Sequence, residues 1–180
     1  MPNHVKTVVK FKHLKPDDIA IILNTIATDK KKYDEDLETD NTYQIDFNKI
    51  IPEPETEDEC PEEYKVNEDS HIRPSDEKPW FNWYKWHIEN WGTKWDAYDC
   101  YTLIGKSWIT FVFSTAWSPA FPIFDKLALL GYDIDIKYAD EDYGSNCGTA
   151  YWASEQGWTY WDESELKDPV RFARNLWNKY

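Results

Sequence analysis

The chain has 180 residues and a formal net charge of −14 at pH 7, because 34 Asp and Glu residues outnumber 20 Lys and Arg residues. An acidic surface repels phosphates, so the composition argues against direct nucleic-acid binding by the bulk of the surface and against docking on an anionic membrane. Aromatic residues make up 17% of the chain, which lets a single domain bury a large area per residue. The acidity either keeps this aromatic-rich chain from aggregating or steers it toward a partner with a basic surface.

Cysteine content and the N-terminal sequence bear on the compartment. Cys60, Cys100 and Cys147 are too few for a disulfide framework, and their spacing matches no zinc site. We therefore expect three reduced thiols. The sequence begins without a signal-peptide pattern and has no apolar run long enough to cross a bilayer, so we expect a cytoplasmic protein without membrane contact.

Strand and helix signals alternate in the N-terminal part. Residues 5–11 alternate apolar side chains with lysines, which predicts a strand with one buried face. Pro16 and the two aspartates after it begin a helix whose apolar residues recur at helical spacing up to Ile26. We expect a charged loop over residues 29–40 and a second strand from residue 43 that ends near residues 50–52.

Residues 53–78 differ in composition from the segments on either side. Acidic residues outnumber Lys and Arg by eleven to three in this stretch, and prolines recur within and beside it. Such a segment has too little apolar surface to form a core. We predict an acidic, proline-containing insertion on the surface of one domain that spans residues 1–180.

Residues 79–95, PWFNWYKWHIENWGTKW, are the most aromatic part of the chain. On a helix, Trp80, Tyr84, His87 and Trp91 form one stripe, and Gly92 can end the helix in the left-handed conformation. The stripe predicts a helix that packs against a sheet. We expect three tryptophans to pack inside the domain, namely Trp83, Trp91 and Trp108.

The C-terminal half contains mostly strand signals. The predicted elements are a hairpin of residues 97–104 and 108–113, a helix that starts at Ser118 and Pro119, a strand over residues 132–138, a hairpin of residues 147–153 and 158–161, and a C-terminal helix within residues 163–180. This mixture predicts an α+β fold with an antiparallel or mixed sheet and helices on one face. Arg171, Arg174 and Asn178 share a face of the last helix, where they pair with the acidic body or form an interface edge.

Several motifs resemble one known family. The motifs are MPNHVK at the N-terminus, DFNKIIPEPE at residues 46–55, WYKWHIENWGTKWDAYD at residues 83–99, FSTAWSPAFPIFDKLA at residues 113–128 and a strand centred on Gly148. They resemble the YubB ferredoxin-like (Api92-like) family of phage and plasmid proteins. The resemblance implies a ferredoxin-like fold, a mobile-element origin and no established catalytic activity. The chain departs from the family at His4, where a Trp is common, and in its longer acidic stretch.

The carboxylates are the first candidate site. The candidate partner-binding residues are Glu53, Glu55, Glu57, Asp58, Glu59, Glu62, Glu63, Asp133, Asp135, Asp140, Glu141 and Asp142. Spaced carboxylates can imitate a phosphate backbone and occupy a basic site on another protein. We therefore favour a non-enzymatic protein-binding module that inhibits a host defence factor in the bacterial cytoplasm. The acids of residues 133–142 could instead bind a hard cation, but they lack the spacing of a calcium loop, and a solvated turn is the favoured interpretation.

The aromatic block is the alternative site. His87, Asn90, Lys94, Trp95 and Trp117 could line a pocket for a nucleotide-like small molecule, or form the site of a small enzyme. The competing interpretation is a packed core in which these polar residues cap helices and satisfy hydrogen bonds. His87 has no nucleophile or second histidine at a useful spacing, which favours a structural role.

Motifs for common cofactors and reactions are absent from the sequence. It contains no P-loop, no GxGxxG, no GxSxG and no HExxH motif, and it has six glycines in total. We therefore expect no cofactor, no metal and no catalytic residues.

Overall fold

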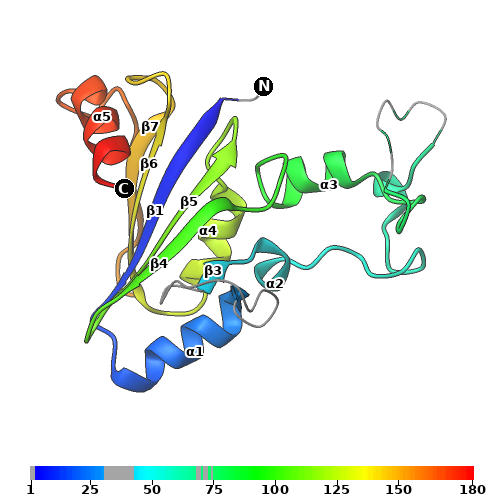
Figure 1. Cartoon of the computed structure of the whole chain (residues 1–180), viewed down its shortest axis with the longest axis horizontal. Coiled ribbons are helices and arrows are strands. Elements are labelled where there is room, and N and C mark those ends of the chain that lie inside the picture. Colours follow the sequence, from blue (N-terminus) through cyan, green and yellow to red (C-terminus); the bar gives the residue numbers. More distant parts are fainter. Residues whose placement is uncertain (1–2, 31–42, 68–69, 71–72, 74) are drawn as a thin grey trace.

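The computed structural model describes residues 3–30, 43–67, 70, 73 and 75–180. Within these residues, one sheet has the strand order β4-β5-β1-β6-β7-β8, and every neighbouring pair is antiparallel (Figure 1). Its strands are β1 (His4–Lys12), β4 (Tyr98–Ile104), β5 (Ile109–Ala116), β6 (Asp133–Asp140), β7 (Cys147–Ala153) and β8 (Gly157–Trp161). Both predicted hairpins in the C-terminal half are therefore confirmed.

Two helices connect the central strands in a characteristic way. Helix α1 (Pro16–Ile26) follows β1, and helix α4 (Phe121–Ala128) joins β5 to β6. The path from β1 to β4 passes over β5, and the path from β5 to β6 passes over β1. Two interleaved βαβ units of this kind form the ferredoxin-like arrangement, so the predicted α+β fold class is confirmed.

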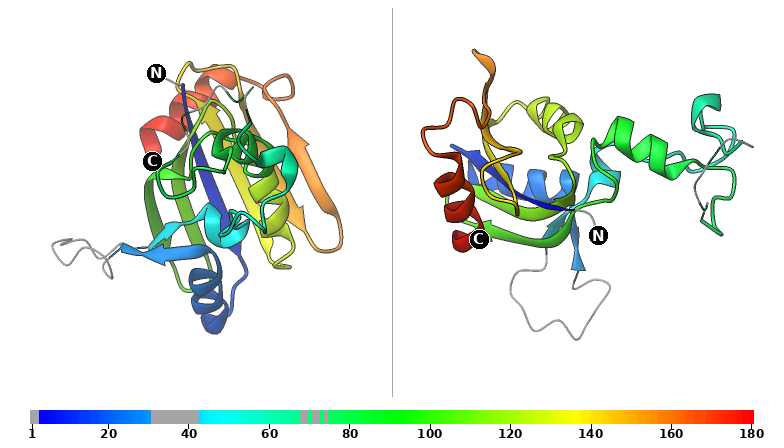
Figure 2. Two further views of the ribbon diagram at one scale, coloured as in Figure 1. Left: turned by 90° about the vertical axis from the view of Figure 1, so that its right-hand side faces the viewer. Right: turned by 90° about the horizontal axis from the view of Figure 1, so that it is seen from above.

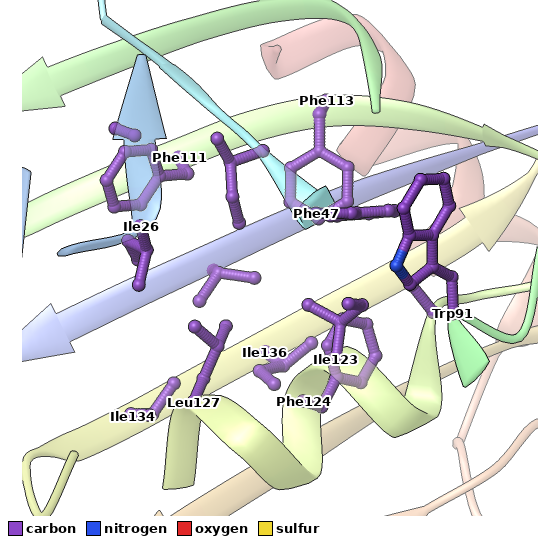
Figure 3. Close-up of a cluster of buried hydrophobic side chains, with 14 of the residues drawn as sticks. Ile26, Phe47, Trp91, Phe111, Phe113, Ile123, Phe124, Leu127, Ile134 and Ile136 are labelled. Atoms are coloured by element: carbon purple, nitrogen blue, oxygen red, sulfur yellow. The ribbon is translucent and has the colours of Figure 1, made fainter. Parts of the chain in front are cut away.

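The main core lies between the sheet and helices α1 and α4. Because side chains alternate along a strand, Val9 and Phe11 of β1 share a face with Phe111 of β5 and Ile136 of β6. Figure 3 shows Ile123, Phe124 and Leu127 of α4 against this face. All of these side chains are at most 1% exposed.

The other face of the sheet is partly covered by helix α5 (Pro169–Lys179), which lies opposite α4 in Figure 2. Asp168 caps this helix by accepting a hydrogen bond from the Arg171 amide, 2.9 Å away. Ala173 and Leu176 pack on apolar residues of β1, β5, β6 and β7. Arg171, Arg174 and Asn178 are exposed, and neither arginine forms an ion pair within the described part of the chain.

A long insertion separates α1 from β4. It contains β2 (Ala27–Asp29), β3 (Tyr43–Ile45), α2 (Phe47–Ile50), a 3-10 turn η2 (Glu62–Tyr64) and α3 (Trp83–Asn90). Strands β2 and β3 pair with each other in a small second sheet. The described residues from 53 through α3 project away from the main sheet, to the right in Figure 1. The predicted loop at residues 29–40 starts within β2, and its residues 31–40 lie outside the described residues.

The predicted second strand is wrong beyond Ile45. Asp46 accepts a hydrogen bond from the Lys49 amide at 3.0 Å and caps α2, so the chain turns into a helix at Phe47. Phe47 is fully buried, with Trp91 and Phe113 in edge-to-face contact at centroid distances of 6.0 and 5.6 Å. The apolar residues at positions 43, 45 and 47 alternate because the chain runs toward the core, which it enters at Phe47.

Two further expectations change in detail. Trp91 is 2% exposed, as predicted for the core, whereas Trp83 and Trp108 are only half-buried, and Trp108 lies on the α5 side of the sheet. Helix α4 begins at Phe121 rather than at Ser118 and Pro119. The Ser118 hydroxyl donates to the Gly92 carbonyl instead of capping that helix, which ties the TAWSP motif to the NWGTKW motif.

Candidate functional site

The acids predicted to face a partner lie in three separate parts of the molecule. Residues 55–63 belong to the projecting insertion, and Asp133 and Asp135 lie on the α5 side of the sheet near the start of β6 (Figure 1). Residues 140–142 lie at the opposite end of β6 and in the turn after it. They therefore do not form one continuous acidic surface.

Asp140 has a structural role and does not belong to the candidate partner-binding surface. It is 4% exposed and accepts hydrogen bonds from the Asn3 and Asn146 side-chain amides, both at 3.3 Å, and from the Asp142 amide at 2.9 Å. The exposed Glu141 and Asp142 also have partners, since Glu141 accepts from the His4 amide and Asp142 from the Asn3 side chain. These carboxylates organise the turn after β6.

The two acids on the α5 side of the sheet are paired with basic groups. Asp135 forms an ion pair with Lys12 at 2.9 Å, and Asp133 lies 3.9 Å from the His13 ring nitrogen. Basic groups of the protein itself therefore partly balance the negative charges of Asp133 and Asp135.

Glu53 anchors the insertion to helix α3. One carboxylate oxygen lies 2.6 Å from His87 Nε2, and the other accepts from Lys78 Nζ at 2.8 Å. Burial by itself would raise the pKa of the Glu53 carboxyl, but the hydrogen bonds from His87 and Lys78 outweigh it and lower the pKa. Glu53 thus holds both ends of the projecting segment and does not face a partner.

His87 is placed by contacts on both ring nitrogens. Its Nδ1 lies 2.8 Å from the Lys94 carbonyl, and its ring stacks on Trp91 with a centroid distance of 4.0 Å. Since both nitrogens face oxygens, the ring donates two hydrogen bonds when it carries a proton on each nitrogen. This arrangement supports the structural interpretation of His87 over that of a general base.

The acidic arm, residues 55–63, is the part of the candidate surface that remains available. Glu55, Glu57, Asp58, Glu59, Glu62 and Glu63 are all exposed. Within the described residues, only Glu62 of this set forms an ion pair, with Lys65. The other carboxylates have no basic partner there.

The arm is held in place by contacts at its base. Cys60 is 4% exposed and Phe81 is 1% exposed, and both belong to the main core cluster. The Val66 amide donates to the Trp80 carbonyl, and the Asn82 amide donates to the Tyr64 carbonyl, each at 2.8 Å. These contacts fix the position of the segment that carries the exposed carboxylates.

The five residues of the predicted aromatic pocket do not line a single pocket. His87 and Trp95 contribute to one hollow of about 340 Å³, which is also lined by Glu53, Ser75, Glu77, Lys78, Phe81 and Trp83. Lys94 instead lies over two exposed rings, 4.6 Å from the Trp95 centroid and 5.2 Å from the Trp117 centroid. Asn90 donates to the Trp86 carbonyl at 3.0 Å and takes no part in either group.

Trp117 has a backbone conformation that the sequence did not reveal. Its φ angle is +70°, a region that L residues rarely adopt, and its side chain is 43% exposed. Hydrogen bonds hold this turn, since the Trp117 amide donates to the Asn3 carbonyl and the Asn146 side chain donates to the Trp117 carbonyl.

Asp96 is a titratable residue that sequence reasoning missed. Burial raises the pKa of its carboxyl to about 6, although hydrogen bonds from the Phe47 and Ala97 amides oppose the rise. Those bonds measure 3.0 and 2.6 Å, and the first joins the start of α2 to the segment before β4. No local pattern could have identified it, because Phe47 is 49 positions away.

No group of three His, Cys, Asp or Glu side chains within the described residues could hold a metal ion. In the same part of the chain, every helix is too short or too polar to cross a membrane. All three cysteines are free thiols, and Cys60 and Cys147 are buried.

Comparison with known proteins gives a family match for most of the C-terminal half of the chain. Residues 90–171 match the family model described as a ferredoxin-like domain in Api92-like protein. This segment belongs to that family. The Api92-like segment contains β4 to β8 and α4, whereas β1, α1 and most of the insertion precede it. No curated protein and no solved structure matches the chain.

Proposed function

We propose that this protein is a non-enzymatic protein-binding module of phage or plasmid origin that inhibits a host defence factor. The acidic arm is the contact surface, and the partner is a host protein with a basic site. The observation that carries the proposal is the row of exposed carboxylates at residues 55–63, which have almost no basic partner within the described residues and are anchored at their base.

The anchoring supports binding because a fixed row of charges loses less conformational freedom on association than a free chain. Hydrogen bonds of Glu53 with His87 and Lys78 hold residues 53 and 78, the two ends of the acidic stretch, together beside α3. The arm can then present its carboxylates at a set spacing to a site that ordinarily binds phosphates. Location in the bacterial cytoplasm, where such a partner operates, is part of the same proposal.

The interactions of the arm also agree with a function that depends on charge alone. His87, which bonds Glu53 beside the arm, has both ring nitrogens engaged in contacts within the protein. A row of exposed acids contributes little to folding, so the fold does not require this density of charge.

The proposal is tested by charge reversal in the arm. A variant with Glu57→Lys, Asp58→Lys and Glu63→Lys should capture far less of the partner from host lysate than the parent chain does. With the purified partner, association should slow more than dissociation accelerates, and raising the salt concentration should weaken binding by the parent.

A matched control reverses three exposed acids away from the arm, Asp125→Lys, Glu155→Lys and Glu163→Lys. This control has the same net charge as the arm variant and should bind like the parent. If both variants lose binding equally, net charge and not the arm is responsible. If the arm variant keeps full activity in a phage or plasmid survival assay, the proposal is wrong.

A small-molecule binder is the second candidate, and the hollow of about 340 Å³ beside Trp83 and Trp95 is the observation in its favour. Glu53 and Glu77 line it and Lys78 is already paired, which disfavours a phosphate group in that hollow. Native mass spectrometry of the purified protein would reveal a retained ligand. A Trp95→Ala variant should release such a ligand, whereas the arm variant should retain it.

A further inference from the structure

The sheet face on the α5 side is exceptional in this acidic protein because basic residues gather on it. Lys10 and Lys12 point from the central strand β1 to this face, and Lys137 does so from the neighbouring strand β6. Lys179 joins them from the end of α5. We call these four residues the lysine face.

Aromatic rings accompany the lysine face. The Lys10 ammonium lies 5.0 Å from the ring centroid of Trp108, that of Lys12 lies 4.6 Å from Tyr151, and that of Lys179 lies 4.7 Å from Tyr180. Trp108, Tyr151 and Tyr180 are half-buried, so part of each ring is accessible from solvent. Cations and π-surfaces therefore alternate over the open part of the sheet.

Three of the four lysines form no ion pair within the described residues, although Asp135 lies opposite Lys10 in the register of β1 and β6. Lys12 is paired with Asp135, and the nearby Asp133 is beside His13. Among the residues that the structure describes, no carboxylate forms an ion pair with Lys10, Lys137 or Lys179. These three lysines remain available to an anionic ligand.

Two adjoining hollows lie on the lysine face. One of about 510 Å³ is lined by Lys10, Tyr101, Leu103, Trp108, Thr110, Lys179 and Tyr180. A second, of about 200 Å³, is lined by Lys137, Phe172, Asn175, Leu176, Lys179 and Tyr180. They share Lys179 and Tyr180, so they form consecutive positions along one surface. The larger hollow has the size of a small-ligand site.

We propose that the lysine face binds single-stranded nucleic acid. Phosphates would contact Lys10, Lys137 and Lys179, and a base in the larger hollow would stack on Trp108 after displacing the lysine ammonium onto a phosphate. Stacking on aromatic rings and charge contacts along the backbone are the two components of sequence-tolerant single-strand binding. The proposal does not depend on the acidic arm, which lies in the projecting insertion.

The net charge of −14 does not prevent this contact. Electrostatic interactions between exposed groups decay over about 8 Å at physiological ionic strength, so the distant arm hardly affects the lysine face. Asp133 and Asp135 adjoin it, and both have basic neighbours. A single strand can also lie on an open sheet face, where a rigid duplex would reach the acidic surroundings.

The test is fluorescence anisotropy of a labelled single-stranded oligothymidylate titrated with the full chain. Three phosphate contacts predict a slope near −2 for log K against log salt concentration, or an affinity loss of about 20-fold between 50 and 200 mM salt. A variant with Lys10→Ala, Lys137→Ala and Lys179→Ala should lose both the affinity and this slope. Trp108→Leu should weaken binding at least about 5-fold with the slope unchanged.

A control with Lys30→Ala, Lys126→Ala and Lys167→Ala removes three exposed lysines outside the lysine face and has the same net charge. It should bind like the parent, and thermal melting of every variant verifies folding. Absence of binding at low salt, equal loss in both triple variants, or equal affinity for duplex DNA would overturn the proposal. So would competition by a free mononucleotide at the same concentration as the oligonucleotide, because a strand-binding surface requires more than one contact.

Discussion

The two faces of the central sheet have opposite characters, although the same strands form both. On one face, Val9 and Phe11 of β1 are fully buried under α1, α4 and the insertion. On the other, Lys10 and Lys12 of the same strand lie over aromatic rings, and α5 covers only part of the surface. The alternation of β1 therefore supplies apolar side chains to the core on one face and a charged, accessible surface on the other.

The largest expected effect comes from the buried face. Trp91→Ala removes a ring that contacts Phe47 and Trp86, together with the hydrogen bond from its Nε1 to the Ile51 carbonyl at 2.9 Å. We expect the free energy of unfolding to fall by about 3–5 kcal/mol. Chemical denaturation measures it, with Trp108→Ala on the open face as the control that loses much less. Equal losses at the two positions would mean that the faces do not differ in this way.

The second effect depends on pH and involves the polar junction beside that core. The folded-state pKa of Asp96 is raised to about 6 from an ordinary 3.8, so the folded state binds a proton more tightly than the unfolded state. Its contribution to stability is therefore present below pH 4 and is lost as pH rises through 6, by about 2–3 kcal/mol. Asp96→Asn should be more stable than the parent at pH 7 and should lack this decline. A pH series of denaturation midpoints measures it, and identical slopes between pH 4 and 6 would contradict the assignment.

A third effect tests how closely β7 packs between its neighbours β6 and β8. A Cβ added at Gly148 would lie 2.5 Å from the Trp161 carbonyl oxygen and 2.6 Å from the Tyr138 hydroxyl. Gly148→Ala should therefore cost about 1–3 kcal/mol, because β7 must shift between its neighbours. Thr149→Ala, at the next position, is the control and should melt close to the parent. A parent-like melting temperature for Gly148→Ala would show that β7 and β8 are less tightly paired than described.

The smallest expected effect comes from the exposed charges. Removing Lys10, Lys137 and Lys179, or reversing Glu57, Asp58 and Glu63, should change the free energy of unfolding by less than about 1 kcal/mol. Differential scanning calorimetry of both triple variants measures this. A larger loss would assign these charges a role in folding, and their binding phenotypes could then no longer be attributed to the surface alone.

Local sequence patterns were sufficient for the elements that depend on neighbouring residues. The period of two in β1 and β6 predicted strands with one buried face, and Pro16 with its following acids predicted the start of α1. The Gly-containing links predicted both C-terminal hairpins. These signals act within a few residues, and the family motifs supplied the ferredoxin-like order of the strands.

The site could be predicted only in part. Composition identified the acidic arm as surface, but it grouped Glu53 and Asp140 with the exposed acids. The structure separates them because their partners come from distant positions: His87 lies 34 residues from Glu53, and Asn3 lies 137 residues from Asp140. Hydrogen bonds and ion pairs between remote residues leave no local pattern.

Spacing and composition were enough to predict the six strands of the main sheet, most helices, the acidic insertion and the overall charge. The three-dimensional arrangement was needed to show that Phe47 begins a buried helix, that α5 covers part of the second face, and that Lys10, Lys137 and Lys179 meet on one surface. The physical reason is that burial and charge clustering depend on which strands become neighbours. Strand β1 lies between β5 and β6, and that order brings together side chains from opposite ends of the chain.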